Sequence, residues 1–122
     1  MPVSAKAVLV VEDEILIRMA IADEIADGGF AVYEAGDADE AIRQLEAHAD
    51  IGLVFTDIDM PGSMDGLKLA RAVRDRWPPV KIILTSGHVT IRREELPVDG
   101  QFVAKPYDSR RLVALFQGLL AG

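Results

Sequence analysis

One ten-residue stretch, Leu53 to Gly62, constrains the fold of this chain more than any other. An apolar run stops there at an acid, Asp57, and a Pro-Gly turn follows. Such a run, closed by a turn signal, is typical of a parallel strand covered on both faces, and ligands of open parallel sheets bind beyond the carboxyl ends of strands. The stretch predicts that Asp57 ends a buried strand and acts as a nucleophile or metal ligand. The alternative is that Asp57 only caps the turn.

Length and composition favour one domain that folds without covalent cross-links. At 122 residues, half of them hydrophobic, the chain is large enough to bury roughly two-thirds of its unfolded surface. The absence of cysteine excludes disulfides and thiolate metal sites and fits a reducing compartment. The first six residues lack the core of a signal peptide, and no apolar run approaches the ~20 residues of a membrane span. We therefore expect a cytoplasmic protein without a membrane partner.

The net charge of the chain limits which classes of partner it can bind. The formal net charge is -7 at pH 7, and this negative charge repels phosphate backbones. Direct binding of nucleic acid is therefore disfavoured. Clustered acidic groups are instead suited to bind a cation.

Strand-like and helix-like segments alternate along the sequence. Predicted strands cover residues 7–11, 30–34, 51–56, 80–85 and 101–104, and helical stripes cover 15–26, 38–49, 69–77 and 112–119, the last capped by Asp108 or Ser109. A further short helix is expected between 89 and 96. This alternation predicts an α/β fold, in which helices cover both faces of a parallel sheet. With no linker or repeat, residues 1–122 are expected to form one domain without an effector domain.

Four predicted strands end in groups that can react or bind. These groups are Glu12 with Asp13, then Asp57, then Thr85 with Ser86, and finally Lys105. Parallel strands bring such ends to one edge, where three carboxylates would repel one another or bind a hard cation such as Mg²⁺. A lysine and a hydroxyl donor beside them complete what a transferring phosphoryl group requires. The inferred product is an aspartyl phosphate on Asp57.

The same residues carry a resemblance to a known family. The matching motifs are Glu12-Asp13, then Asp57 with Met60-Pro61 and Asp65-Gly66 after it, then Leu84-Thr85, and Lys105-Pro106. Over nearly its whole length the chain resembles a receiver domain of two-component response regulators. The resemblance implies a flavodoxin-like sheet in the order 2-1-3-4-5 and a single-domain, chemotaxis-regulator-like signalling switch that is not otherwise an enzyme. It also implies phosphoryl transfer from a histidine kinase or phosphotransfer protein, and a downstream protein partner.

The resemblance also assigns a magnesium site. It implies that Asp13 and Asp57 bind Mg²⁺ directly, that Glu12 helps through water, and that the backbone carbonyl of Asp59 completes the protein ligands. The loop 61–66 is one residue longer than the commonest form in this family. Its geometry beside the metal is therefore not carried over.

Switching residues follow from the same resemblance. Thr85 and Lys105 are expected to take phosphoryl oxygens, and Phe102 matches an aromatic position that moves inward when the threonine is drawn to the phosphate. Ser86 and Asp59 flank the path of attacking water and are expected to set the lifetime of the aspartyl phosphate. The segment between Gly87 and Asp99 has only a weak helical pattern. Family members often bind their partners through this region, so the partner-binding surface is the part of the resemblance that can be carried over least.

Two other function classes fit parts of the pattern. The pair Asp57 and Asp59 is similar to the Asp-x-Asp motif of haloacid-dehalogenase-type phosphatases, which are Mg²⁺-dependent enzymes with an aspartate nucleophile. That interpretation leaves Glu12 and Asp13 without a role and normally needs a longer chain. A flavodoxin-like cofactor binder is the third class, but a flavin phosphate favours hydroxyls and amides over acidic loop ends.

The remaining distinctive residues have structural interpretations. His48 is expected to be a solvated helix terminus, and His88 a structural or exposed loop residue. Trp77 and Met19 are expected in the core. The charged run 92–95 is most simply a solvated helix face.

Overall fold

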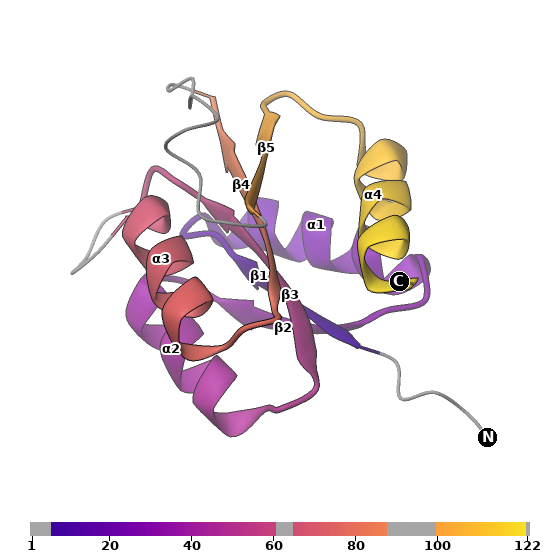
Figure 1. Ribbon diagram of the computed structural model, residues 1–122. Helices are drawn as coiled ribbons and strands as arrows, with labels where there is room; N and C mark the ends of the chain where they lie inside the picture. The colour runs from indigo at the N-terminus through magenta and orange to yellow at the C-terminus, as the bar shows by residue number, and fades with distance from the viewer. Residues whose placement is uncertain (1–5, 61–64, 88–99, 122) are drawn as a thin grey trace.

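The computed structural model describes residues 6–60, 65–87 and 100–121, in which strands and helices alternate (Figure 1). The strands are β1 (Ala7–Val11), β2 (Ala31–Ala35), β3 (Ile51–Asp57), β4 (Lys81–Ser86) and β5 (Gly100–Ala104). The helices are α1 (Ile15–Asp27), α2 (Ala38–Ala47), α3 (Gly66–Arg76) and α4 (Ser109–Ala121). None of these described helices is long and apolar enough to cross a membrane.

The five strands form one parallel sheet in the order β2-β1-β3-β4-β5, which confirms the predicted fold and strand order. All seven residues of the central strand β3 are buried, as expected for a strand covered on both faces. The register pairs Val11 with Thr56 and Asp57 with Thr85. The carboxyl ends of β1, β3 and β4 therefore meet at one edge of the sheet.

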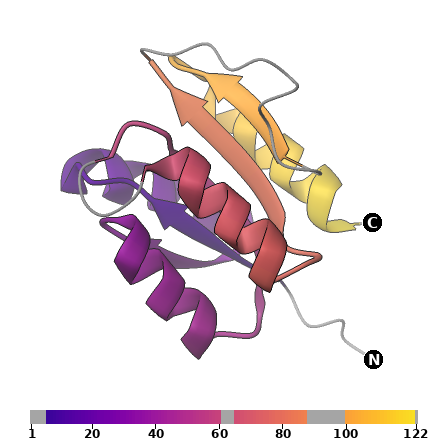
Figure 2. The same ribbon diagram turned by 60° about the vertical axis from the view of Figure 1, so that its left-hand side comes forward.

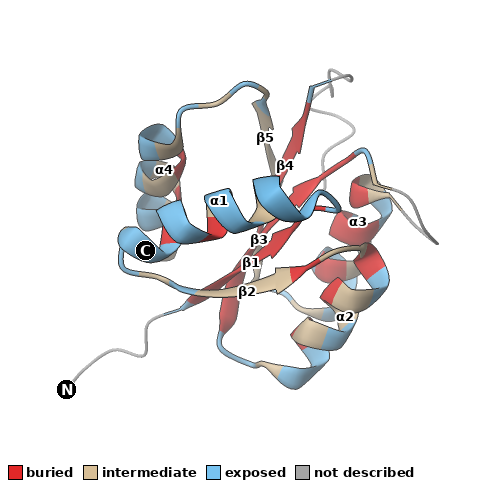
Figure 3. Cartoon of the chain, turned by 180° about the vertical axis from the view of Figure 1, so that it is seen from behind, coloured by how far each residue is buried: buried red, intermediate tan, exposed pale blue. Residues whose placement is uncertain are grey.

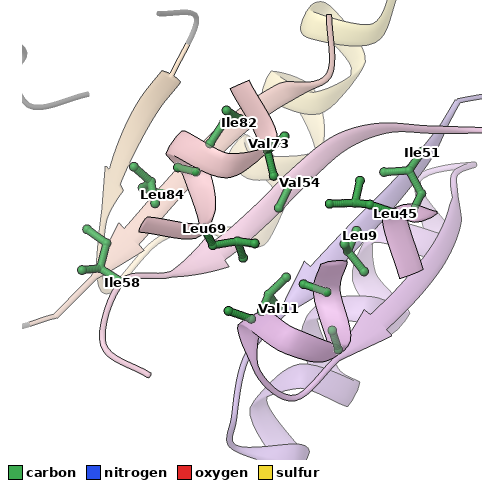
Figure 4. Close-up of a cluster of buried hydrophobic side chains, with 14 of the residues drawn as sticks. Leu9, Val11, Leu45, Ile51, Val54, Ile58, Leu69, Val73, Ile82 and Leu84 are labelled. Atoms are coloured by element: carbon green, nitrogen blue, oxygen red, sulfur yellow. The ribbon is translucent and has the colours of Figure 1, made fainter. Parts of the chain in front are cut away.

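Helices α2 and α3 cover one face of the sheet, and α1 and α4 cover the other (Figures 1 and 2). On the first face, Leu45 of α2 and Leu69 and Val73 of α3 belong to one buried cluster with Leu9 and Val54 of the sheet (Figure 4). Leu69 and Val73 are four residues apart, so they share one side of α3. Burial of this cluster stabilises the helical layer on the sheet.

The second face has its own core, which is rich in aromatic rings. Phe55 of β3 meets Phe116 of α4 edge to face, with ring centroids 5.6 Å apart, and Ile25 of α1 joins the same buried cluster. Edge-to-face pairs add to the stability gained from area alone. This contact fixes α1 and α4 over the strand that ends at Asp57.

Backbone hydrogen bonds at the starts of α2, α3 and α4 are accepted by acidic side chains, those of Asp37, Asp65 and Asp108. The Asp65 carboxylate accepts a hydrogen bond from the Lys68 N–H at 3.0 Å, so α3 begins at Gly66, three residues before the predicted stripe. The Asp108 carboxylate accepts from the Arg110 N–H at 2.9 Å, just before α4. Of the two predicted caps, Asp108 and Ser109, this contact supports Asp108.

The predicted strands agree with the observed ones to within one residue at each end. Helix α2 ends at Ala47, two residues before the end of its predicted stripe. The short helix expected between 89 and 96 lies outside the described residues, as do His88, the charged run 92–95 and most of the loop 61–66.

The prediction that Met19 lies in the core is wrong. Met19 is 50% exposed, and three further apolar residues in the first half of α1, Ile15, Leu16 and Ile17, are also exposed. Figure 3 shows that much of α1 is exposed. The sequence of α1 is apolar around most of its circumference, so periodicity did not identify which residues face the sheet.

Two of the remaining structural interpretations can be compared with the structure. Trp77 is only partly buried and packs against the edge of the cluster under α2 and α3, so its predicted place in the core is confirmed in part. His48 follows the end of α2 and is only partly exposed, because its ring stacks on Tyr33 with centroids 4.0 Å apart. The Tyr33 hydroxyl also donates to the Asp50 carboxylate.

Candidate functional site

Three carboxylates gather where β1 and β3 end. Glu12 and Asp13 follow β1, Asp57 is the last residue of β3, and one oxygen from each lies within 4.8 Å of the others. Glu12 and Asp57 are buried, whereas Asp13 is exposed. The predicted proximity of these three acids is confirmed.

The Asp57 carboxylate is held by donors on both of its oxygens. The Asp59 N–H donates to Oδ1 at 3.0 Å, and the Lys105 ammonium donates to Oδ2 at 2.7 Å. The main chain is fixed as well, because the Ile58 N–H donates to the Thr85 carbonyl at 2.9 Å. A carboxylate held in this way would have little orientational freedom to lose in a reaction.

Glycine is required at the start of α3 for this packing. A Cβ on Gly66 would lie 2.8 Å from the Cα of Ile58 and would also clash with the Asp57 main chain. The Gly66 N–H donates to the Ile58 carbonyl at 3.1 Å. The Asp-Gly pair of the sequence motif thus lets the helix begin directly against the end of β3.

Lys105 supplies the positive charge of the site. Its ammonium lies 2.7 Å from Asp57 Oδ2 and 3.5 Å from Glu12 Oε1, and its own N–H is anchored to the Ser86 carbonyl at 3.1 Å. Partial burial lowers the pKa of Lys105, but the hydrogen bond and negative charge of Asp57 outweigh this effect, so the pKa is raised. Lys105 is therefore a permanent cation at neutral pH.

Glu12 has an unusual environment for a carboxylate. Burial raises the pKa of Glu12 to about 7, and contacts with Asp13 and the charge of Asp57 act in the same direction. The hydrogen bond from the Glu14 N–H, at 3.0 Å, and the charge of Lys105 oppose the rise. Crowded acids of this kind are common at sites that act on a ligand.

The hydroxyl residues at the end of β4 differ in their contacts. Thr85 Oγ1 is buried and has no hydrogen-bond partner among the described residues. Ser86 Oγ donates to Asp59 Oδ2 at 2.6 Å. A buried hydroxyl without a partner is rare and destabilising. The Thr85 hydroxyl is therefore suited to donate a hydrogen bond to an acceptor on a ligand, or to move toward such an acceptor.

A hollow of about 220 Å³ lies over this edge of the sheet. Its lining residues are Glu12, Asp13, Glu14, Ile17, Asp57, Asp59, Gly87 and Lys105. The lining is polar except for one apolar side chain from α1. The space is therefore suited to a small, charged group.

The donor set fits Mg²⁺. This ion takes oxygen ligands, keeps several waters and usually binds through one or two carboxylates. The cluster offers three carboxylates, and Asp13 is open to water, which can complete the coordination shell. Asp59, whose carbonyl is the fourth expected ligand, lines the same hollow.

The structure also places Phe102 and reveals two residues that sequence analysis missed. Phe102 is partly buried against the cluster under α2 and α3, opposite Leu84 in the register of β4 and β5. The Tyr107 ring meets Phe55 edge to face at 5.7 Å, and burial raises the pKa of Tyr107 to about 12. The other missed residue, Arg18, donates to the Glu12 carbonyl at 3.0 Å. Tyr107 follows the Lys-Pro motif by one residue, a signal that could have been used, whereas nothing in the spacing marks Arg18.

Comparison with known proteins assigns this architecture to a family. Residues 8–117 match the model of the response regulator receiver domain. The nitrogen assimilation regulatory protein NtrX of Azorhizobium caulinodans is 32% identical over 120 residues, which are 95% of this chain and 26% of NtrX. The sensor kinase CckA of Brucella abortus is 32% identical over 117 residues, 93% of this chain and 12% of CckA. The chain thus spans about a quarter or less of the length of these relatives.

A solved response regulator structure has the same fold as this chain. The response regulator TrrA of Thermotoga maritima, in complex with Mg²⁺ and beryllofluoride, superposes with a TM-score of 0.84 at 29% identity, over 94% of this chain and 99% of TrrA.

Proposed function

Because the chain belongs to the response regulator receiver domain family, we propose that Asp57 accepts a phosphoryl group from a phosphohistidine of a histidine kinase or phosphotransfer protein. Receiver domains are signalling switches, and this chain is proposed to have no enzymatic activity beyond its own phosphorylation and dephosphorylation. The observation that carries the proposal is the 2.7 Å contact between Lys105 and Asp57 within a cluster of three carboxylates.

The proposed step is a displacement at phosphorus. A carboxylate oxygen of Asp57 attacks the phosphorus atom as the bond from phosphorus to the imidazole nitrogen breaks. The electron pair of that bond stays on the imidazole, and an acyl phosphate forms on Asp57. Lys105, already beside the nucleophile, is placed to contact a phosphoryl oxygen and offset its charge.

Glu12, Asp13, Asp57 and the Asp59 carbonyl are proposed to hold Mg²⁺. When bound, the ion neutralises charge on the phosphoryl oxygens. The chain's own contribution is to keep the three carboxylates within 4.8 Å of one another despite their repulsion. The Mg²⁺ and beryllofluoride in the TrrA structure support this assignment by analogy.

Phosphorylation is proposed to act through Thr85 and Phe102. A phosphoryl group adds about -1.5 to -2 charge and three strong acceptors. The unpartnered hydroxyl of Thr85 gives the chain a donor that can respond to those acceptors. A shift of this residue changes the packing at the end of β4, opposite β5 and Phe102, and a downstream protein partner would recognise that change.

The phosphoryl donor is proposed to dock over the first half of α1. Ile15, Leu16, Ile17 and Met19 form an exposed apolar patch, here named the α1 patch. Ile17 lines the hollow that contains Asp57, so a protein that delivers a phosphoryl group would also cover apolar side chains. With a net charge of -7, the chain is better suited to a protein partner than to nucleic acid.

No finding favours the phosphatase alternative. The Asp59 carboxylate, which would be the general acid of an Asp-x-Asp enzyme, accepts a hydrogen bond from Ser86 at 2.6 Å. Glu12 and Asp13, which that interpretation left without a role, lie at the site itself.

Acetyl phosphate provides a test that needs no partner protein. Incubation of the parent with acetyl phosphate and Mg²⁺, followed by intact mass measurement, should show one added phosphoryl group. Asp57→Asn keeps the shape but removes the nucleophile, so it should show none. A matched control is Asp50→Asn, which changes an exposed acid beside Tyr33 and should label like the parent. Equal labelling of Asp57→Asn and the parent would refute the assignment.

A further inference from the structure

The side chain of Arg18 joins three parts of the molecule next to the acidic cluster. From α1 its Nε donates to Glu34 Oε1 on the edge strand β2 at 3.1 Å, and its Nη1 donates to the Glu12 carbonyl at 3.0 Å. The Arg18 side chain is only 17% exposed. One guanidinium thus ties α1, β2 and the residue after β1 together.

The surroundings of Arg18 accommodate the guanidinium. A Cβ on Gly36 would lie 3.1 Å from Arg18 Nη1, so a larger residue there would crowd it. The Gly36 N–H donates to Glu40 Oε1 at 2.9 Å, and Gln44 donates to the Glu34 carbonyl at 3.1 Å. The main chain of the residue that pairs with Arg18 is therefore held by α2, which adds to its place in β2.

The contact with Arg18 is one of three hydrogen bonds that hold Glu12. Its N–H donates to the Ala35 carbonyl at 3.1 Å, its carbonyl accepts from Arg18, and its Oε2 accepts from the Glu14 N–H. Glu14, at the N-cap of α1, makes no side-chain capping bond. Arg18 thus supplies a side-chain link between α1 and the turn that carries Glu12 and Asp13.

We propose that Arg18 is a positioning residue for the metal site, which holds the Glu12–Asp13 turn in the geometry that binds Mg²⁺. This inference rests on the proposed function, since it assumes that those acids are the ligands. Residues that orient metal ligands through hydrogen bonds typically contribute 10- to 100-fold in affinity. Because Arg18 acts through a backbone carbonyl, we expect an effect of about tenfold, the lower end of that range.

Calorimetric titration of the metal-free protein with Mg²⁺ tests this role. Arg18→Ala should raise the Mg²⁺ dissociation constant by about tenfold, measured well below its melting temperature. The matched control is Arg76→Ala, which removes an exposed ion pair with Glu46 at the far end of α3 and should leave the constant unchanged. A dissociation constant for folded Arg18→Ala within about twofold of the parent, less than the smallest typical effect, would overturn the proposal.

Two further variants separate positioning from general stabilisation. Arg18→Lys can pair with Glu34 but lacks the planar fork that reaches two acceptors at once. It should therefore recover most of the melting temperature but not the Mg²⁺ affinity. Full recovery of both would show that a simple ion pair is enough and would overturn the role of the Glu12 carbonyl.

Glu34→Ala decides the question if Arg18→Ala does not fold. This change leaves Arg18 in place but removes its anchor on β2, so Mg²⁺ binding should weaken, by less than the roughly tenfold loss expected for Arg18→Ala. Unchanged affinity would refute the proposal. Failure of the proposed function is recognised separately, because the parent itself would then not bind Mg²⁺ or would not be labelled at Asp57.

Discussion

Helices α1 and α2 both follow a strand of the same sheet, and both begin beside three acidic residues, yet they use those acids differently. In α2 the Asp37 carboxylate accepts from the Glu40 N–H at 2.8 Å, and the Glu40 carboxylate accepts from the Gly36 N–H. This reciprocal arrangement resembles a capping box and satisfies backbone donors at the helix start. The acids of α2 therefore stabilise the helix.

The acids before α1 face the functional site instead. Glu12 and Asp13 belong to the carboxylate cluster, and Glu14 at the N-cap makes no capping bond with its side chain. Glu12 accepts from one backbone donor at this helix start, the Glu14 N–H at 3.0 Å, but the same carboxylate also belongs to the cluster. The acids before α1 therefore serve the candidate site more than the helix.

The solvent-facing sides of α1 and α2 also differ in polarity. The exposed positions of α2 are largely polar, whereas α1 exposes the four apolar residues of the α1 patch. Compared with α2, helix α1 therefore has less stabilisation from its N-cap. It also exposes more apolar surface to solvent. Both features are concentrated beside Asp57, where the phosphoryl donor is proposed to bind.

The largest effect expected from this contrast is on core packing. Leu45 of α2 is 4% exposed and Leu16 of α1 is 79% exposed. Leu45→Ala should reduce the free energy of unfolding by about 2–5 kcal/mol, through lost burial and a cavity. Leu16→Ala should change it by less than about 0.5 kcal/mol. Urea unfolding of both variants measures the difference, and a comparable loss for Leu16→Ala would mean that the α1 patch is buried in solution.

The sequence predicted the sheet well because strands and their ends carry strong local signals. The run before Asp57 is apolar without interruption, and the acid and turn that follow mark where it stops. The positions of Glu12, Lys105 and Thr85 at strand ends then follow from the parallel topology alone. This is why the candidate site could be assembled before the structure was known.

Other features depend on contacts that the sequence does not encode locally. Met19 was misplaced because α1 has no single apolar face from which its orientation could be read. Arg18 of α1 was missed because its contacts are with Glu34, sixteen residues away on strand β2, and with the carbonyl of Glu12. The Ser86 contact with Asp59 spans 27 residues. Such pairings become visible only when the fold fixes which strands are neighbours.

The next largest effect concerns metal binding at the start of α1. The proposed binding of Mg²⁺ to the folded state should stabilise the parent by about 2.7 kcal/mol at 100 times the dissociation constant. Asp13→Ala removes a proposed ligand and should lose most of that gain, because Asp13 is the exposed member of the cluster. Thermal unfolding with and without Mg²⁺ measures both values.

Asp37→Ala is the matched control for that measurement, since it removes an acid from the start of α2. This variant should be less stable than the parent but should gain as much from Mg²⁺ as the parent does. A reduced gain in Asp37→Ala would show that Mg²⁺ responds to the general negative charge of the chain, and the contrast between the two helix starts would then disappear.

The smallest effect expected is on helix capping itself, measured without metal. Asp37→Ala removes the oxygen that accepts from the Glu40 N–H, so it should reduce the free energy of unfolding by about 1 kcal/mol. Glu14→Ala removes a carboxylate that makes no capping bond, and should cost less than about 0.5 kcal/mol. Urea unfolding in a chelating buffer at physiological ionic strength keeps helix-dipole effects small. An equal loss for Glu14→Ala would mean that this carboxylate caps α1 in solution, and the acids before α1 would then be divided between capping the helix and binding the ligand.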